Sequence, residues 1–290
     1  RNLKMSKRPE SVAPPELFYN ETESRKYANS SRMIEVQSQM AERTLELLAL
    51  PSHPCFLLDI GCGSGLSGEV LSEQSHYWVG IDISTAMLGV AVERDVEGDL
   101  FVCDMGQGLF FRNGVFDGCI SVSALQWLCN ADKKSHHPKK RLEKFFQSLY
   151  NCLKPGARAI FQLYPETPQQ MQLITECAMR CGFSGGLVVD FPNSTKARKL
   201  FLCLFAGASM EIPTGLSNEM SDEEDSKDSV LFSKPEKERI RSRSRRRLSS
   251  KRKNIKDRNW VKTKKEKMRR RGRTVPNDSK YSARRRRPQF

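Results

Sequence analysis

Short hydrophobic segments and helical patterns alternate along residues 55–183, and this alternation then stops. Five segments have the length and apolar content of buried strands: 55–60, 76–83, 98–104, 115–123 and 157–164. Helical patterns lie between them or after them, at 65–74, 84–94, 138–153 and 167–183. This order is typical of a parallel sheet that is covered by helices on both faces.

The two strand-like segments that follow have no helix between them. Residues 186–193 and 199–207 are separated only by the short sequence STKAR. A crossover between parallel strands needs about a dozen residues or more. We therefore predict that the last two strands are antiparallel. One further helix is predicted over residues 20–50, ahead of the first strand.

A glycine-rich turn, LLDIGCGSGLSG at residues 57–68, connects the first strand to the next helix. Such a turn lets the backbone approach a ligand closely, and it can serve a phosphate, a dinucleotide or a sulfonium cofactor. A phosphate loop would need a lysine that is absent here. The dinucleotide alternative stays open, because residues 63–68 match GxGxxG and Asp82 ends the second strand.

Two features favour the sulfonium cofactor. The glycine spacing begins early, as Asp59-x-Gly61-x-Gly63-x-Gly65, and the sheet ends in an antiparallel pair of strands. Together they resemble the S-adenosylmethionine-dependent methyltransferases with the Rossmann-like α/β fold. The resemblance implies a seven-stranded sheet of order 3-2-1-4-5-7-6, with the last strand antiparallel and helices on both faces.

The same resemblance assigns cofactor contacts to matching positions. It implies that the methionine part of the cofactor contacts Asp59, Gly61, Cys62 and Gly63. It implies further that the ribose hydroxyls bind Asp82 and that adenine contacts Ile83, Asp104 and Met105. A carboxylate such as Asp82 can accept hydrogen bonds from both ribose hydroxyls. Two simpler interpretations remain open at this stage: Asp82 as a helix cap and Asp104 as a turn residue.

A narrower resemblance covers most of the chain. Residues 14–33, 117–131, 163–166 and 182–194, together with the basic C-terminus, resemble the eukaryotic small-subunit (18S) rRNA guanine-N7 methyltransferases. This resemblance implies methylation of one guanine during pre-rRNA processing and small-subunit biogenesis in the nucleus, in nucleoplasm and nucleolus, with a cytoplasmic pool. It also implies a heterodimer with a small zinc-binding activator subunit.

Methylation at guanine N7 needs no general base, because N7 already presents a lone pair. Catalysis then depends on alignment and on the exclusion of water. The target base must leave its stack, and an aromatic wall would hold it with about 1–3 kcal/mol of stacking free energy. Trp127, Tyr27 and Tyr164 are candidates for that wall, and Gln126 could hydrogen-bond the base. The alternative is that these aromatic residues belong to the core.

Charge divides the chain unevenly. Residues 218–290 hold 27 basic and 11 acidic residues, whereas residues 1–217 hold 22 basic and 23 acidic residues. We predict an N-terminal extension (1–19), a methyltransferase domain (20–209), and an acidic linker followed by a basic, disordered, RNA-binding tail (210–290). Its Arg and Lys runs suit phosphate binding and nuclear import.

Several classes of protein do not fit. No apolar run is long enough to span a membrane, and the nine cysteines lack the spacing of a zinc site, so no metal is expected. Three other functions remain as alternatives: a ribosome assembly scaffold whose catalysis is dispensable, a methyltransferase for protein or small molecules, and a NAD enzyme.

Overall fold

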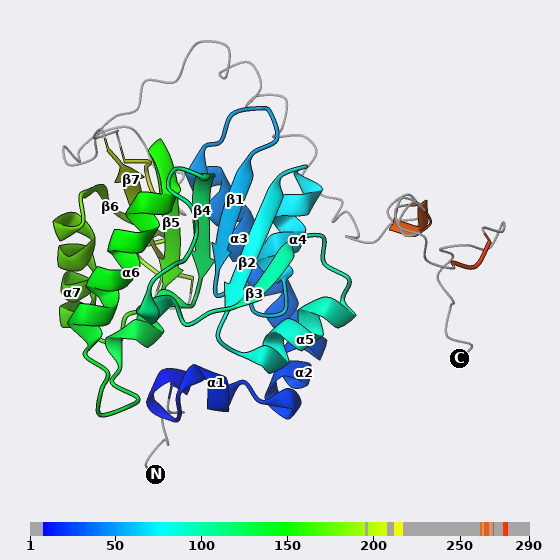
Figure 1. Ribbon diagram of the computed structural model, residues 1–290, viewed down its shortest axis with the longest axis horizontal. Helices are drawn as coiled ribbons and strands as arrows, with labels where there is room; N and C mark the ends of the chain where they lie inside the picture. Colours follow the sequence, from blue (N-terminus) through cyan, green and yellow to red (C-terminus); the bar gives the residue numbers. More distant parts are fainter. Residues whose placement is uncertain are drawn as a thin grey trace. The chain divides into compact units, whose positions relative to one another are not determined.

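The computed structural model describes residues 8–194, 197–207, 212–216, 262, 264–266, 269 and 275–277. The chain divides into two units, Arg1–Phe232 and Ser233–Phe290. The first unit contains a seven-stranded sheet of order β3-β2-β1-β4-β5-β7-β6 (Figure 1). This order confirms the prediction. Strand β7 is antiparallel to β6, as the short connection between them required, and it is also antiparallel to β5.

The strands lie close to their predicted positions. They are β1 (Phe56–Ile60), β2 (Tyr77–Asp82), β3 (Asp99–Val102), β4 (Phe116–Val122), β5 (Leu153–Leu163), β6 (Phe183–Asp190) and β7 (Lys199–Ala206). Strand β5 begins four residues earlier than predicted. The sequence KPG, which lies between the predicted helix (138–153) and the predicted strand (157–164), is part of β5, and Leu153 already pairs with Phe116 of β4.

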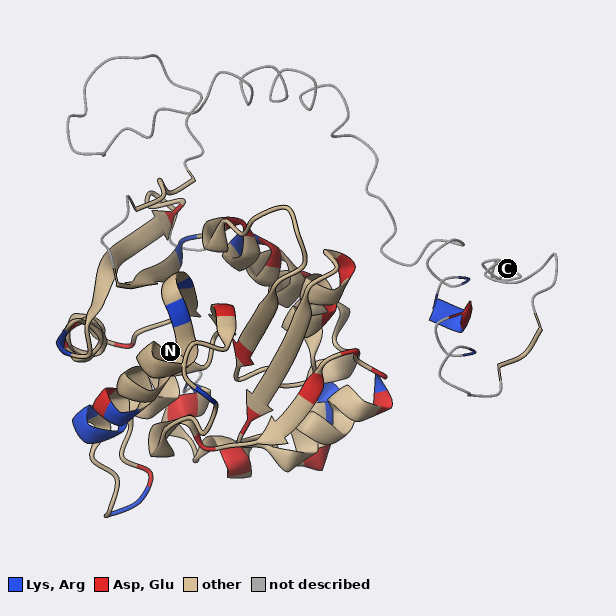
Figure 2. Ribbon diagram, turned by 45° about the horizontal axis from the view of Figure 1, so that its top comes forward, with Lys and Arg blue, Asp and Glu red and all other residues tan. Residues whose placement is uncertain are grey.

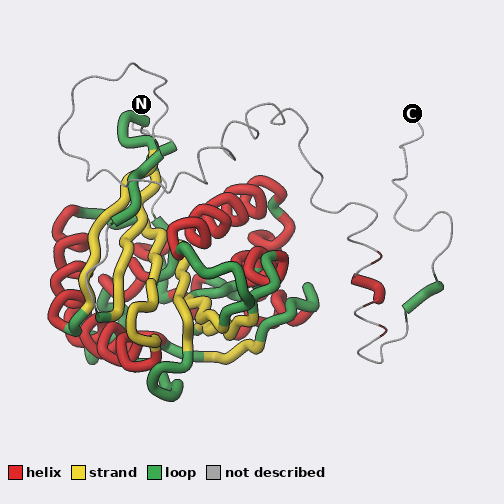
Figure 3. The backbone as a smooth tube through the Cα atoms, turned by 90° about the horizontal axis from the view of Figure 1, so that it is seen from above, coloured by secondary structure: helices red, strands yellow, loops and turns green. Residues whose placement is uncertain are grey.

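Helices cover both faces of the sheet (Figure 3). They are α1 (Pro15–Phe18), α2 (Glu21–Asn29), α3 (Ser31–Leu48), α4 (Leu66–Glu73), α5 (Thr85–Glu93), α6 (Pro138–Cys152) and α7 (Pro168–Arg180), with short 3-10 helices η1 (Pro9–Ser11), η2 (Met105–Gln107) and η3 (Leu125–Cys129). One core cluster includes buried side chains of α6 and α7, and the other includes side chains of α3, α4 and α5.

The prediction of a single helix over residues 20–50 is wrong in one respect. Two helices, α2 and α3, occupy this range, and extended Ser30 separates them. Its hydroxyl accepts a hydrogen bond from the Met33 N–H, which caps α3, while the side chain of Asn20 caps α2. Both caps satisfy N–H groups that a helix leaves without a partner.

Segments outside the predicted domain limits also pack on this body. The Arg8 guanidinium donates to the Tyr164 carbonyl (2.8 Å), and the Ser84 hydroxyl donates to the Tyr19 carbonyl (2.8 Å). Beyond residue 209, the Leu216 N–H donates to Asp190 (2.8 Å). The packed body thus includes residues on both sides of the range 20–209, whose limits stay a prediction.

Most of the predicted tail lies outside the described residues. In the second unit the described basic residues are Lys262, Lys264, Lys265 and Arg269 (Figure 2). The side chains of Lys265 and Arg269 both donate to the Pro276 carbonyl. In the described part of the chain, no helix is long and apolar enough to cross a membrane, and no cluster of three His, Cys, Asp or Glu side chains could hold a metal ion.

Candidate cofactor and substrate pocket

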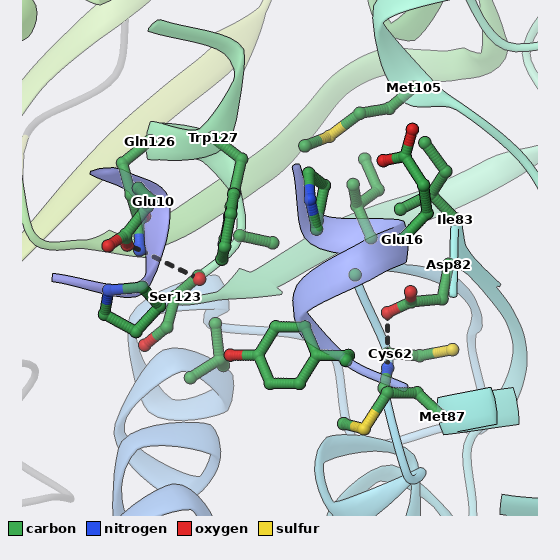
Figure 4. A pocket seen from close by; sticks show the side chains of 18 of the residues that line it. Glu10, Glu16, Cys62, Asp82, Ile83, Met87, Met105, Ser123, Gln126 and Trp127 are labelled. Atoms are coloured by element: carbon green, nitrogen blue, oxygen red, sulfur yellow. Dashed lines mark hydrogen bonds between the residues drawn. The ribbon is translucent and has the colours of Figure 1, made fainter. Parts of the chain in front are cut away.

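A cavity of about 490 Å³ lies at the carboxyl edge of the sheet (Figure 4). Its walls come from η1, α1, the β1–α4 loop, η3 and the ends of β2, β3, β4 and β5. Cavities of this size hold small-molecule ligands. Eleven of the twelve residues predicted from the sequence line it: Tyr27, Gly61, Cys62, Gly63, Asp82, Ile83, Asp104, Met105, Gln126, Trp127 and Tyr164.

Asp59 is the exception, because its side chain has no exposed surface and does not line the cavity. One carboxylate oxygen accepts a hydrogen bond from the Ser67 hydroxyl (2.6 Å), and the other has no partner among the described residues. Burial raises the pKa of Asp59 from 3.8 to about 7. Asp59 therefore lies behind the glycine loop, and it reaches the cavity only through Ser67.

The glycine loop is bent so that its backbone faces the cavity. Gly61 and Gly63 have φ values of +71° and +53°, a region that favours glycine. A Cβ atom on Gly61 would lie 2.3 Å from the Cβ atom of Ala124. The N–H groups of Gly61 and Cys62 both donate to the Ile81 carbonyl, at 2.8 and 3.1 Å, so the loop is fixed to the end of β2.

Asp82 completes this attachment. Its two carboxylate oxygens accept hydrogen bonds from the backbone N–H groups of Gly63 (2.9 Å) and Ser84 (2.8 Å). The N-cap of α5 is Ser84 and not Asp82, so Asp82 has no capping role for that helix. A carboxylate offers about four acceptor positions, and acceptor capacity therefore remains for a ligand. Burial raises the pKa of Asp82, and the backbone hydrogen bonds oppose that rise.

Asp104 does have the turn role that the sequence left open. Its side chain accepts from the Gly106 N–H (2.9 Å) and thereby caps η2. It also forms an ion pair with Arg141 (2.7 Å), in which both side chains are largely buried. Sequence analysis did not identify Arg141 as a pocket residue. The basic run at the start of α6 offered three similar candidates, and only the helix orientation selects one of them.

Aromatic side chains form one wall of the cavity. Trp127 is 7% exposed, and its ring centroid lies 6.0 Å from that of Tyr19, which in turn lies 6.1 Å from Tyr27. Burial raises the pKa of Tyr19 to about 12 and raises the pKa of Tyr27 further, so both phenols stay protonated. The Tyr164 hydroxyl accepts a hydrogen bond from Lys199 (2.8 Å).

Glu10 and Gln126 lie together on one side of Trp127, whereas Asp82, Ile83 and Met105 lie on the other side (Figure 4). The Gln126 amide donates to the Glu10 carboxylate and to the Ser123 carbonyl, both at 2.9 Å. Sequence analysis missed Glu10, because the N-terminal extension has no hydrophobic period that would place it against the domain. The cavity thus has two chemically distinct ends.

The features at the end of the cavity near Asp82 fit a nucleoside cofactor. The glycine loop leaves no room for side chains, Asp82 keeps acceptor capacity, and the buried Ser64 hydroxyl has no partner among the described residues. These are the features by which a chain binds ribose and the polar groups of an amino acid. The residues present therefore fit S-adenosylmethionine.

Comparison with known proteins gives matches along the whole chain. The family model described as "Methyltransferase domain" matches residues 58–161, and the model "Methyltransferase involved in Williams-Beuren syndrome" matches residues 204–288. The 18S rRNA (guanine-N(7))-methyltransferase RID2 of Arabidopsis thaliana is 56% identical, over 99% of this chain and 100% of that protein. The 18S rRNA (guanine-N(7))-methyltransferase of Mus musculus is 56% identical, over 98% and 99%.

A more distant relative and a solved structure extend the comparison. The 18S rRNA (guanine(1575)-N(7))-methyltransferase of Saccharomyces cerevisiae is 46% identical, over 98% of this chain and 99% of that protein. A structure of phosphoethanolamine N-methyltransferase 2 of Haemonchus contortus, in complex with phosphomonomethylethanolamine and S-adenosylhomocysteine, has a TM-score of 0.50 at 18% identity. It covers 66% of this chain and 58% of its own, and it supports the fold alone.

The buried carboxyl group of Asp59 predicts a pH effect on stability. Its pKa is raised on folding, so the folded chain loses stability as the pH rises from about 4 to about 7, by up to about 4 kcal/mol for this group. An Asp59→Asn variant has no ionisable group at this position, so it does not lose stability for this reason as the pH rises. We expect its stability relative to the unaltered chain to increase between pH 4 and pH 7 in urea unfolding experiments. A constant difference between the two proteins across this range would contradict the prediction.

Proposed function

This chain belongs to the family of 18S rRNA (guanine-N7)-methyltransferases, and we propose that it transfers a methyl group from S-adenosylmethionine to N7 of a guanine in small-subunit rRNA. One observation carries the proposal. A single cavity joins the glycine loop and Asp82 at one end to Trp127 and Gln126 at the other. Identity of 46–56% to named enzymes of this activity over nearly the full chain supports it.

In this proposal the cofactor occupies the end of the cavity at β1, β2 and β3. Asp82 accepts hydrogen bonds from the ribose hydroxyls, Ile83 and Met105 contact adenine, and Asp104 accepts from its amino group. The loop residues Gly61, Cys62 and Gly63 contact the methionine part, and Asp59 supports them from behind through Ser67. The cofactor supplies a methyl group on a positively charged sulfur.

The protein's own contribution to the chemistry is alignment. Guanine N7 has a free lone pair, so no side chain has to remove a proton before attack. Trp127, Tyr27 and Tyr164 provide apolar surface for an extruded base, and Gln126 provides polar contacts. The largely buried walls exclude water from the reacting atoms, which strengthens electrostatic interactions there.

We assign the implied partner, a small zinc-binding activator subunit, to the free edge of the sheet at β3. Two apolar side chains of β3 are strongly exposed, Phe101 (50%) and Val102 (63%). Phe110 is also exposed (85%), and the ring of its neighbour Phe111 contacts that of Phe101. A free strand edge with apolar side chains is a place where a second chain can add a strand. Such a partner would cover these side chains and the unpaired backbone of β3.

The basic tail supports a place of action in ribosome biogenesis within the nucleus. Its Arg and Lys residues would bind rRNA phosphates without regard to sequence and would also act as import signals. In this proposal the tail binds rRNA phosphates irrespective of sequence, and the cavity binds a single base. A scaffold role with dispensable catalysis is the alternative, and a comparison of Asp82→Asn with deletion of the protein in cells separates the two.

The proposed reaction predicts labelled 7-methylguanosine. We expect small subunits from cells that lack this enzyme to yield that nucleoside after incubation with labelled S-adenosylmethionine, the chain and the activator subunit. In an Asp82→Asn variant a neutral amide replaces the carboxylate that accepts from the ribose hydroxyls. This variant should therefore bind S-adenosylhomocysteine roughly 30-fold more weakly. Glu35→Gln is the control, because Glu35 is exposed on α3 and does not line the cavity.

One result of the labelling experiment would contradict the methylation proposal, and a comparison in cells separates catalysis from a scaffold role. If no label appears in 7-methylguanosine although the cofactor binds, the methylation proposal fails. If Asp82→Asn abolishes methylation in cells but ribosome maturation continues, while deletion of the protein stops maturation, the scaffold role dominates.

The proposed partner surface predicts that Phe110→Lys prevents heterodimer formation. Phe110 is 85% exposed, so a lysine there should leave the fold intact but place a charge in the covered interface. Leu187→Lys on the opposite edge strand, β6, is the control, since Leu187 is also exposed. Size-exclusion chromatography after co-expression measures complex formation. A Phe110→Lys chain that still elutes with the partner would place the interface elsewhere.

The tail predicts a salt effect and an import effect. Removal of residues 218–290 takes away a net charge of +16, so rRNA binding by the shortened chain should be weaker and should depend less steeply on salt. The slope of log affinity against log salt measures this. A fluorescent fusion of the shortened chain should also fail to accumulate in the nucleus. Equal slopes for both chains, or unchanged nuclear accumulation, would remove the corresponding role from the tail.

A further inference from the structure

The end of the cavity near Trp127 contains a carboxylate whose role the proposed reaction does not yet explain. Glu10 lies in η1, and two residues of the η3 region hold it in place. The Gln126 amide donates to one carboxylate oxygen (2.9 Å), and the Asn130 amide donates to the Glu10 backbone carbonyl (3.0 Å). Both contacts join segments more than 100 positions apart in the sequence, so the position of Glu10 is built by the fold.

Glu10 differs in its partners from two other acidic residues of the cavity, Glu16 and Asp104. Glu16 pairs with Lys133 (3.5 Å), and Asp104 pairs with Arg141 (2.7 Å). Among the described residues, no ion pair neutralises Glu10, and Gln126 is the donor to its side chain. One carboxylate oxygen therefore retains its full acceptor capacity, and it does so beside the aromatic wall formed by Trp127 and Tyr19.

We propose that Glu10 selects guanine by accepting hydrogen bonds from its N1–H and its N2 amino group. This inference rests on the proposed function and names the determinant of base choice within the same cavity. These two donors lie side by side on the Watson–Crick edge, and a carboxylate matches them with its two oxygens. N7 lies on the opposite side of the purine. A base held by Glu10 at one edge thus turns N7 away from Glu10, toward the end of the cavity that contains Asp82.

Other bases would not satisfy this carboxylate. Adenine has an acceptor at N1, which would face the acceptor oxygens of Glu10 and repel them. Cytosine and uracil have no N7 to methylate. A polar site whose partner is missing rejects an analogue strongly, because its buried groups are left unpaired. Glu10 therefore gives the cavity a reason to choose guanine that stacking on Trp127 cannot supply.

The charge of Glu10 also follows the reaction. During transfer, the N7 lone pair forms the new N–C bond, and the electrons of the C–S bond remain on sulfur, which becomes a neutral thioether. The purine takes up the positive charge, and its N1–H becomes a stronger donor. Hydrogen bonds to Glu10 thus strengthen in the transition state, and interactions of this kind raise kcat in addition to lowering KM.

The test compares two substrates with the full chain and its activator subunit. Small subunits are reconstituted with rRNA that carries either guanine or inosine at the methylated position. Inosine keeps N1–H and N7 but lacks the N2 amino group. With the unaltered protein we expect kcat/KM to be at least tenfold lower for inosine. With Glu10→Ala we expect roughly 100-fold lower kcat/KM for guanine and nearly equal values for the two substrates.

Two controls separate base recognition from loss of structure. S-adenosylhomocysteine binding by Glu10→Ala should stay within about threefold of the unaltered value, since Glu10 lies at the other end of the cavity. Glu21 is exposed at the start of α2, and Glu21→Ala should leave unchanged both the activity and the ratio of kcat/KM for guanine to that for inosine. A Glu10→Ala variant that binds the cofactor and still prefers guanine tenfold overturns the inference.

The remaining outcomes are also decisive. If the unaltered chain methylates guanine and inosine equally well, the N2 amino group is not recognised and the inference is wrong, while the proposed function stands. If the unaltered chain methylates neither substrate, the proposed function fails and the role of Glu10 fails with it.

Discussion

The attachment of the glycine loop to the end of β2 is the interaction on which the site depends. The Ile81 carbonyl and the Asp82 carboxylate together hold the N–H groups of Gly61, Cys62 and Gly63. These hydrogen bonds fix the loop that leads into the N-terminus of α4 and that forms one wall of the cavity. They also hold the Asp82 carboxylate, through the same oxygens to which we assign the ribose hydroxyls. With that assignment, cofactor binding and loop geometry belong to one hydrogen-bonded network, in which removal of Asp82 affects both.

The sequence was sufficient for the parts of the structure that depend on local chemistry. The alternation of strand and helix patterns predicted a mostly parallel sheet, and the short STKAR connection predicted that the last two strands are antiparallel. The sheet order itself was implied by the resemblance of these features to the methyltransferases. The boundary at Ser30 was missed because helical residues lie on both sides of it. The start of β5 was missed because the sequence KPG usually ends a helix, whereas here Leu153 pairs with Phe116 across the sheet.

The residues that sequence analysis missed in the cavity share one property: their roles depend on contacts between distant segments. Glu10 reaches Gln126, and Arg141 reaches Asp104, through the packing of the whole body. No periodic pattern in residues 9–19 predicts that this stretch lies against η3. Asp59 shows the reverse case. Its position in the motif suggested a cofactor contact, but only the burial of its side chain shows that it acts behind the loop.

The two ends of the cavity come from different parts of the chain. Asp82 and the glycine loop belong to the first strands of the sheet, whereas Glu10 and Tyr19 come from a short N-terminal segment laid across its edge. The segment is held by a few contacts, such as those of Arg8 with Tyr164 and of Ser84 with Tyr19. In evolutionary terms, the sites that we propose for the methyl donor and for the choice of acceptor are separable. A sheet of this kind could keep its cofactor and acquire a new substrate through changes in the segment that precedes α2.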